Sequence, residues 1–163
     1  LANFAGGVLI LLFRPFKVGD SIVAGGSAGT VESIEMFRTV LRDAKNEMIY
    51  VPNGTLSNNI VVNSSQSDRL QASVTVLIDY NDDIDKARAL LLGAVENDAL
   101  VLKTPAPAVG FLPQPANIAV TLSFWCAPGD VTPLTGKYSE TAIQILKREG
   151  YRLGTTARTA PAS

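Results

Sequence analysis

The chain has 163 residues, of which 47% are hydrophobic and 18% are charged. This composition is too apolar for a disordered chain, and the length suffices for one ordinary domain or two small ones. With 14 basic and 15 acidic residues, the net charge is −1. The chain therefore lacks the positive surplus that binds a nucleic-acid backbone, and we expect no nucleic acid among its partners.

Histidine is absent and cysteine occurs once, at Cys126. Without histidine, the chain lacks the usual general base near neutral pH and the commonest metal ligand. Cys126 lies in an alternating apolar run and is predicted to be a buried hydrophobic residue rather than a reactive thiol. The glycines form no dinucleotide fingerprint, and no lysine is placed for a phosphate loop. The sequence thus predicts no enzyme, no catalytic residues, no cofactor and no metal.

The first 13 residues, LANFAGGVLILLF, are apolar apart from Asn3, and Arg14 and Lys17 follow them. A full membrane crossing needs about 20 apolar residues, so this run is too short to span a bilayer by itself. A signal peptide would carry its basic residues before the run rather than after it. A buried soluble helix and a truncated membrane helix both remain, and the basic flank favours the membrane helix. We therefore expect the chain to be a piece of a longer protein.

Four small residues lie in this run: Ala2, Ala5, Gly6 and Gly7. Small residues on a membrane helix let neighbouring helices approach closely, so we expect these four to pack against other helices. Pro15 is expected to end the helix, because the residue before a proline avoids the helical region.

From residue 18 to residue 67 the sequence predicts short strands and tight turns. Gly19-Asp20 and Gly25-Gly26-Ser27 are turn signals, and Pro52-Asn53-Gly54 is predicted to close a strand as another turn. The expected strands are Ser21–Val23, Gly29–Glu35, Phe37–Arg42, Met48–Val51 and Ile60–Asn63. Such closely spaced short strands predict a small, bent β-barrel or sandwich. A core this small gains stability from partners.

After a polar linker at residues 64–68, the pattern changes to strands and helices. Val74, Val76 and Ile78 alternate with other residues along a predicted strand. Asn81 or Asp82 is expected to cap the helix that follows. The aspartates near this point (Asp79, Asp82, Asp83 and Asp85) lack the spacing of a calcium loop, so we interpret them as helix-capping residues.

The remaining pattern consists of a short apolar stretch at Ala108–Leu112, an alternating strand at Ile118–Phe124 and an amphipathic helix that Gly150 ends. A last strand is expected near Arg152–Arg158. The order β-α-β-β-α predicts a ferredoxin-like sandwich, so the whole chain is expected to be of the α+β class.

Several segments resemble the small-conductance mechanosensitive channel (MscS) family. They are FRPFKVGD at Phe13–Asp20, GTVESIEMFRTVLRD at Gly29–Asp43, IYVPNGTL at Ile49–Leu56 and YNDDIDKA at Tyr80–Ala87. The opening LANFAGGVLILL is similar to the second half of the family's pore-lining third helix. The resemblance covers nearly the whole chain and is most specific up to residue 63.

The resemblance implies a channel that opens under membrane tension and releases solutes on osmotic downshock. Residues 1–17 would be the end of the pore helix, residues 18–67 an Sm-like β-domain, and residues 68–163 a cytoplasmic α/β domain that surrounds a vestibule. The implied partners are other copies of the chain, commonly seven in a homoheptamer, the lipid bilayer at the N-terminal end, and permeating ions and small solutes. The implied location is a bacterial-type inner membrane, with the residues after about 14 on the cytoplasmic side.

The resemblance also assigns roles to individual residues. Pore-helix packing falls on Ala2, Ala5, Gly6 and Gly7. Coupling between the helix and the β-domain falls on Asn3, Arg14, Pro15, Phe16, Pro52, Asn53 and Gly54. The family's pore-constricting leucines would precede Leu1.

Two other classes of function are weighed against the channel. A soluble Sm-like ring that binds RNA would need basic, base-stacking positions, and the net charge disfavours it. A structural oligomeric scaffold without channel activity is the other alternative.

Overall fold

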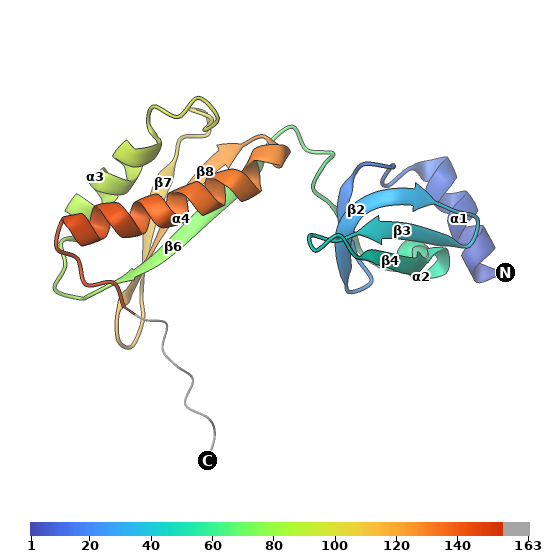
Figure 1. The fold of residues 1–163 in the computed structure, drawn as a ribbon, viewed down its shortest axis with the longest axis horizontal. Coiled ribbons are helices and arrows are strands. Elements are labelled where there is room, and N and C mark those ends of the chain that lie inside the picture. The colour runs from blue at the N-terminus through green and yellow to red at the C-terminus, as the bar shows by residue number, and fades with distance from the viewer. Residues whose placement is uncertain (155–163) are drawn as a thin grey trace, which may run out of the picture. The chain divides into compact units, whose positions relative to one another are not determined.

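The computed structural model describes residues 1–154, and these belong to two compact units (Figure 1). The first unit is Leu1–Asp68 and the second begins at Arg69.

The first unit starts with helix α1 (Ala2–Phe13). The helix ends before Pro15, as the sequence predicts. Arg14 takes a left-handed conformation with φ 48°, and its N–H donates to the carbonyl oxygen of Ile10 at 2.8 Å. This bond satisfies one of the carbonyls that a helix end leaves free.

Five strands form one antiparallel sheet in the first unit. They are β1 (Ser21–Ala24), β2 (Ser27–Ile34), β3 (Arg38–Arg42), β4 (Met48–Pro52) and β5 (Val61–Asn63), in the order β4-β3-β2-β1-β5. Gly25 and Gly26 form the two-residue turn between β1 and β2 with φ values of 58° and 80°. Positive φ at both positions suits the twist of a β-hairpin, and glycine adopts it without strain.

A short helix, α2 (Asn53–Asn58), follows β4 directly. The sequence predicts only a turn at Pro52-Asn53-Gly54, so the helix is a correction to that expectation. Leu56 of α2 is buried in a core that Ile10 of α1, Phe16 and strand residues complete. The inward strand residues of this core are Ile22, Ala24, Val31, Leu41 and Val51.

The second unit contains a three-stranded antiparallel sheet and two long helices. Its elements are β6 (Leu70–Ile78), α3 (Ile84–Val95), β7 (Ala108–Pro113), β8 (Ile118–Cys126), the single turn η1 (Pro128–Asp130) and α4 (Val131–Arg148). The strand order is β6-β8-β7, so the first strand lies beside the third. This arrangement is that of a split βαβ sandwich.

Side chains of β6 and β8 that point the same way meet the two helices. The register places Val74 opposite Leu122 and Ala72 opposite Phe124, and all four side chains are buried. Phe124 contacts Tyr138 of α4 edge to face, with ring centroids 5.3 Å apart. Together the two units confirm the predicted α+β class.

Two local expectations need correction. Asp83 caps α3, since its Oδ1 accepts hydrogen bonds at 3.0 Å from the N–H groups of Asp85 and Lys86. The predicted caps Asn81 and Asp82 instead hydrogen-bond to Asp79, at the start of the same turn. The tertiary position of the turn selects the cap, because all three side chains have suitable chemistry.

Gly150 ends α4 as predicted. It takes φ 86°, and the N–H of Tyr151 donates to the carbonyl oxygen of Leu146 at 3.0 Å. Residues 152–154 form no strand, although Gly154 donates one bond to the carbonyl oxygen of Leu77 on β6. The rest of the strand expected at Arg152–Arg158 lies outside the described residues.

Candidate functional site

The most closely packed contact involving predicted site residues lies between α1 and α2. Only three residues of α1 are buried: Gly6, Gly7 and Ile10. A Cβ atom added at Gly6 would lie 2.7 Å from the carbonyl carbon and oxygen of Asn53. One added at Gly7 would lie 2.6 Å from the carbonyl oxygen of Met36. The helix backbone reaches α2 because these two positions lack side chains.

Asn3 and Gly54 form a second contact between these helices. The Oδ1 atom of Asn3 accepts a hydrogen bond from the N–H of Gly54 at 3.1 Å. A Cβ at Gly54 would lie 2.8 Å from that oxygen, so a side chain there would displace Asn3 or the helix. The bond also satisfies an N–H in the first turn of α2, where helical N–H groups lack partners within the helix.

The side chain of Asn53 fixes the start of α2 against the sheet. Its side chain is 0% exposed, with Oδ1 accepting from the hydroxyl of Thr39 at 2.9 Å and Nδ2 donating to the carbonyl oxygen of Glu35 at 2.8 Å. Its backbone N–H donates to Phe37 at 3.0 Å. A buried amide with both ends satisfied fixes one orientation of the chain. Pro52 precedes it with φ −59°, an extended conformation that ends β4 and starts α2.

The end of α1 joins the sheet through Arg14, Pro15 and Phe16. Phe16 is buried in the core of the first unit and anchors this junction. The carbonyl oxygen of Pro15 accepts hydrogen bonds from the side chains of Asn63 and Gln66. The seven residues predicted to couple the helix to the β-domain therefore lie in two places, the α1–α2 contact and this junction.

The four residues predicted for pore-helix packing divide into two pairs. Gly6 and Gly7 are buried against their own chain, whereas Ala2 and Ala5 are exposed. Packing of these residues against helices of other copies stays a prediction. Sequence reasoning missed Thr39 and Met36, which complete the contact. The sequence does carry a signal for Thr39. It is a polar residue within a predicted apolar strand, and a buried hydroxyl needs a hydrogen-bond partner.

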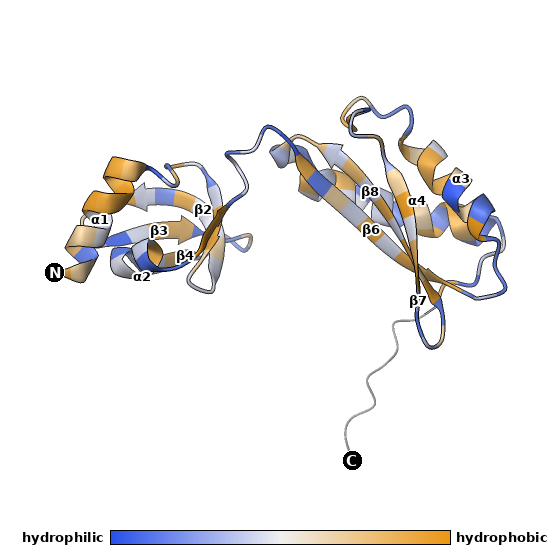
Figure 2. Ribbon diagram, turned by 180° about the vertical axis from the view of Figure 1, so that it is seen from behind, coloured by the Kyte–Doolittle hydropathy of each residue, from blue (hydrophilic) through white to orange (hydrophobic). Residues whose placement is uncertain are grey.

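The remaining face of α1 exposes large apolar side chains. Its exposed large side chains are Leu1, Phe4, Val8, Leu9, Leu11, Leu12 and Phe13. The part of this helix away from the N-terminus is orange in Figure 2, because its residues are strongly hydrophobic. Among residues 1–154, no helix has both the length and the hydropathy that a membrane crossing requires.

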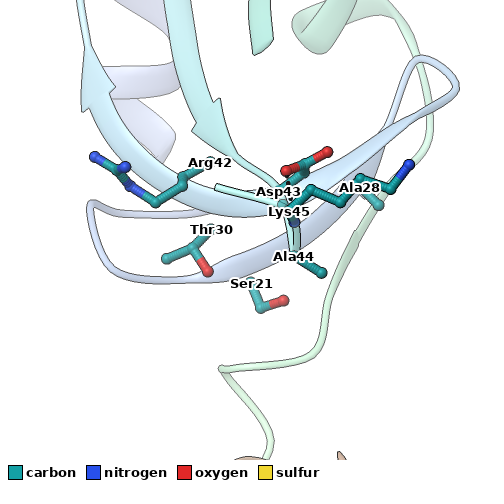
Figure 3. Close-up of a pocket in the computed structure, with 8 residues that line it drawn as sticks. Ser21, Ala28, Thr30, Arg42, Asp43, Ala44 and Lys45 are labelled. Atoms are coloured by element: carbon teal, nitrogen blue, oxygen red, sulfur yellow. Dashed lines mark hydrogen bonds between the residues drawn. The ribbon is translucent and has the colours of Figure 1, made fainter. Parts of the chain in front are cut away.

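The first unit also has a hollow of about 480 Å³, lined by β1, β2 and the turn between β3 and β4 (Figure 3). Arg42 at its rim makes two bonds to Glu32, at 2.9 and 3.0 Å. The Oδ1 atom of Asp43 accepts from the N–H groups of Lys45 and Glu47, both at 2.8 Å. Arg42 holds the pKa of Glu32 below its usual range through their hydrogen bond. These charged groups stabilise the strand pairing and the turn.

The partly buried carboxylate of Asp98 ties α4 to the loop after α3 in the second unit. The Oδ2 atom of Asp98 accepts from Lys137 Nζ and from the Tyr138 hydroxyl, both at 2.6 Å. These bonds, with one from the N–H of Leu100, lower the pKa of Asp98 to about 2. Burial and the same bond raise the pKa of Tyr138. The ion pair holds the loop after α3 against α4 and is not a predicted functional site.

Comparison with known proteins places residues 1–66 in a family described as the mechanosensitive ion channel β-domain. A small-conductance mechanosensitive channel of Edwardsiella ictaluri is 38% identical over 102 residues, which are 63% of this chain and 36% of the relative. The mechanosensitive channel MscK of Escherichia coli is 32% identical over 110 residues, which are 67% of this chain and 10% of the relative. The chain thus spans less than half the length of either relative.

A solved structure has a similar fold along almost the whole chain. The crystal structure of Helicobacter pylori MscS in a closed state superposes with a TM-score of 0.86 at 20% identity. The match covers 99% of this chain and 65% of that one.

Proposed function

Because this chain belongs to the MscS family of mechanosensitive channels, we propose that it is part of a channel subunit that opens under membrane tension. In this proposal, residues 1–17 are the end of the pore-lining helix, residues 18–67 are an Sm-like β-domain, and residues 68–163 form the cytoplasmic α/β domain. The channel would release ions and small solutes on osmotic downshock. The family is one of ion channels rather than enzymes, and we propose no catalytic activity.

One observation carries the proposal: α1 has two faces of different chemistry. Its glycine face lies against α2 within one chain, and its other face exposes large apolar side chains. An exposed apolar helix is unfavourable in water and needs lipid or protein around it. The end of a pore helix, next to a bilayer and to the same helices of other copies, supplies both. Arg14 and Lys17 then mark the cytoplasmic side of an inner membrane.

The sheet of the first unit supports a homo-oligomer. The strand order leaves β4 and β5 as edges, and Met48, Tyr50 and Val62 on these strands are exposed. Unpaired edges carry free N–H and C=O groups that another strand can satisfy. We propose that neighbouring copies close a ring in this way. A homoheptamer is the assembly that the family resemblance implies.

Membrane tension opens the channel if the open state occupies more membrane area than the closed state. Tension then stabilises the open state in proportion to the area gained, as a ligand stabilises the state that it binds better. This chain would anchor the ends of the pore helices rather than sense tension directly. We propose that the contact of Gly6 and Gly7 with α2, and the bond from Gly54 to Asn3, stabilise the collapsed, non-conducting state.

Substitution of Gly54 tests this assignment in the full-length channel. Gly54→Val places a Cβ 2.8 Å from Asn3 Oδ1, and overpacking of this kind costs about 1–3 kcal/mol. We expect inactivation under sustained tension to slow by roughly tenfold in patch-clamp records. Gly136→Val on α4 is the control, because an added Cβ there meets no atom within 4 Å. Equal inactivation rates in the two variants would contradict the assignment.

The channel activity itself is tested by survival of osmotic downshock. A bacterium that lacks its own mechanosensitive channels should survive a sudden dilution when it expresses the complete gene. Patch-clamp recording of its membrane should show currents that rise with suction. A product that assembles in the membrane but neither rescues the cells nor conducts would be a structural scaffold.

A further inference from the structure

The loop that leaves α1 is hydrogen-bonded to the segment that leaves the first unit. Asn63 is the last residue of β5, and its Nδ2 donates to the carbonyl oxygen of Pro15 at 3.1 Å and to Asp20 Oδ2 at 2.8 Å. These two bonds use both hydrogens of the amide. Residues 15 and 20 flank the turn between α1 and β1, and residue 63 is more than forty positions further along the chain.

Residues 64–66 add further bonds between the same two segments. Gln66 Nε2 donates to the carbonyl oxygen of Pro15 at 3.2 Å, and the N–H of Ser21 donates to Ser65 Oγ at 2.8 Å. The N–H of Ser64 donates to the carbonyl oxygen of Ser21 at 3.1 Å. We call the bonds that Asn63 and Gln66 make to Pro15 and Asp20 the junction clamp.

The buried carboxylate of Asp20 makes Asn63 the central member of the clamp. Asp20 is 3% exposed, and its other recorded donor is the N–H of Lys17 at 3.1 Å. Among residues 1–154, no lysine or arginine side chain forms an ion pair with it. A buried carboxylate that loses a donor is strongly destabilised, because nothing replaces its hydration. Asn63 therefore holds the turn after α1 in place.

The clamp lies very close in sequence to the second unit. Gln66 is followed by Ser67 and Asp68, and the second unit begins at Arg69. Three residue steps span at most roughly 11 Å, so the chain between the clamp and the second unit has little slack. A displacement of the start of the second unit would therefore be transmitted to Pro15 through this short stretch of chain and the bonds of the clamp. Pro15 lies two residues beyond the end of α1.

We propose that Asn63 and Gln66 are positioning residues that couple the end of α1 to the second unit, so that a restraint on the second unit biases the opening of the channel. This inference rests on the proposed function and adds a route of regulation to it. The clamp fixes Pro15 and the turn at Asp20, and these fix where α1 ends. Releasing the clamp, or lengthening the chain after it, should free α1 from the second unit in the same way.

The test is a double-mutant cycle in the full-length channel, recorded by patch clamp. One change is Asn63→Ala, and the other inserts two glycines between Ser67 and Asp68. Each alone should change the ratio of open to closed channels at a fixed tension by about fivefold or more, in the same direction. Together they should produce no further change, because both interrupt one route. A merely structural role for Asn63 would give additive effects.

Two further variants keep the result interpretable. Asn59→Ala is the control, since Asn59 makes one local bond in the same unit, to the carbonyl oxygen of Thr55 at 2.7 Å. Gln66→Ala removes only the exposed bond to Pro15 and should shift the ratio in the same direction as Asn63→Ala, by less. This variant replaces Asn63→Ala in the cycle if the latter does not assemble.

The outcomes separate the clamp from the channel function. Additive effects, or an Asn63→Ala channel that behaves like Asn59→Ala, would overturn the clamp while leaving the channel intact. An assembled wild-type channel that carries no current under tension would overturn the proposed function and the clamp with it.

Discussion

The two units of the chain bury their apolar residues in opposite ways. In the second unit, α4 places Leu134, Tyr138, Ala142 and Leu146 on one buried stripe, and its exposed residues are mostly polar. In the first unit, α1 buries two glycines and one isoleucine and leaves its large apolar side chains exposed. Within the described residues, the core of the second unit has 17 buried members and that of the first has 8.

This difference shows where each unit obtains its stability. The amphipathic α4 satisfies its apolar face within one chain, as the helices of an independently stable domain do. The apolar α1 cannot, because apart from Ile10 its buried residues are glycines, which bury little apolar area. The second unit is therefore expected to be stable by itself, whereas the first unit depends on a membrane or on other copies.

The largest expected effect contrasts two phenylalanines, one in each unit. Phe124 is 0% exposed and Phe13 is 74% exposed. We expect Phe124→Ala to destabilise the second unit by roughly 3–5 kcal/mol, through lost burial and a cavity. Phe13→Ala in the isolated chain should change stability by only about 0.5 kcal/mol. Urea unfolding followed by unit-resolved hydrogen exchange measures both.

A large effect of Phe13→Ala in the isolated chain would break the contrast between the units. It would mean that the exposed face of α1 is already covered within one chain. In the assembled channel the same variant should weaken the oligomer, because the proposed partners of that face are then present.

A smaller effect is expected at Asp98, which joins the loop after α3 to α4 in the second unit. Its pKa of about 2, below the ordinary value of 3.8, means that the ionised form stabilises the fold above about pH 4. That stabilisation, up to about 2 kcal/mol, is lost as the pH falls towards the pKa of the folded state. Asp98→Asn should therefore be less stable than the wild type near neutral pH, and the two should converge in acid.

Fluorescence of Trp125 can follow this unfolding, since it is the single tryptophan of the chain and lies in the second unit. Asp85→Asn is the control, because the side chain of Asp85 is 84% exposed. A pH-independent difference between Asp98→Asn and the wild type would contradict the role of the charge.

The smallest expected effect concerns helix caps. Asp83 caps α3, whereas α1 begins without a side-chain cap. Asp83→Ala should cost the second unit about 1 kcal/mol, because two N–H groups lose their acceptor. Asn81→Ala should cost less, and thermal unfolding of the two variants compares them. Equal losses would mean that the whole turn, rather than one cap, stabilises the start of α3.

Local patterns in the sequence were sufficient for most of the elements. Alternating apolar residues predicted β6 and β8, paired glycines predicted the hairpin turn, and Pro15 predicted the end of α1. Each signal works because it acts within a few residues, through side-chain direction or an allowed backbone angle.

By itself, the sequence determined the class of the fold, the order of nearly all the elements and the family resemblance. Only the tertiary structure decided that residues 53–58 form a helix, because Asn53 is held by Thr39 and Glu35, more than ten positions away in the chain. It also decided that Gly6 and Gly7 face α2 of their own chain. A short helix has no periodic pattern of its own, and a glycine carries no side chain to indicate its neighbour. Contacts between distant segments settle both.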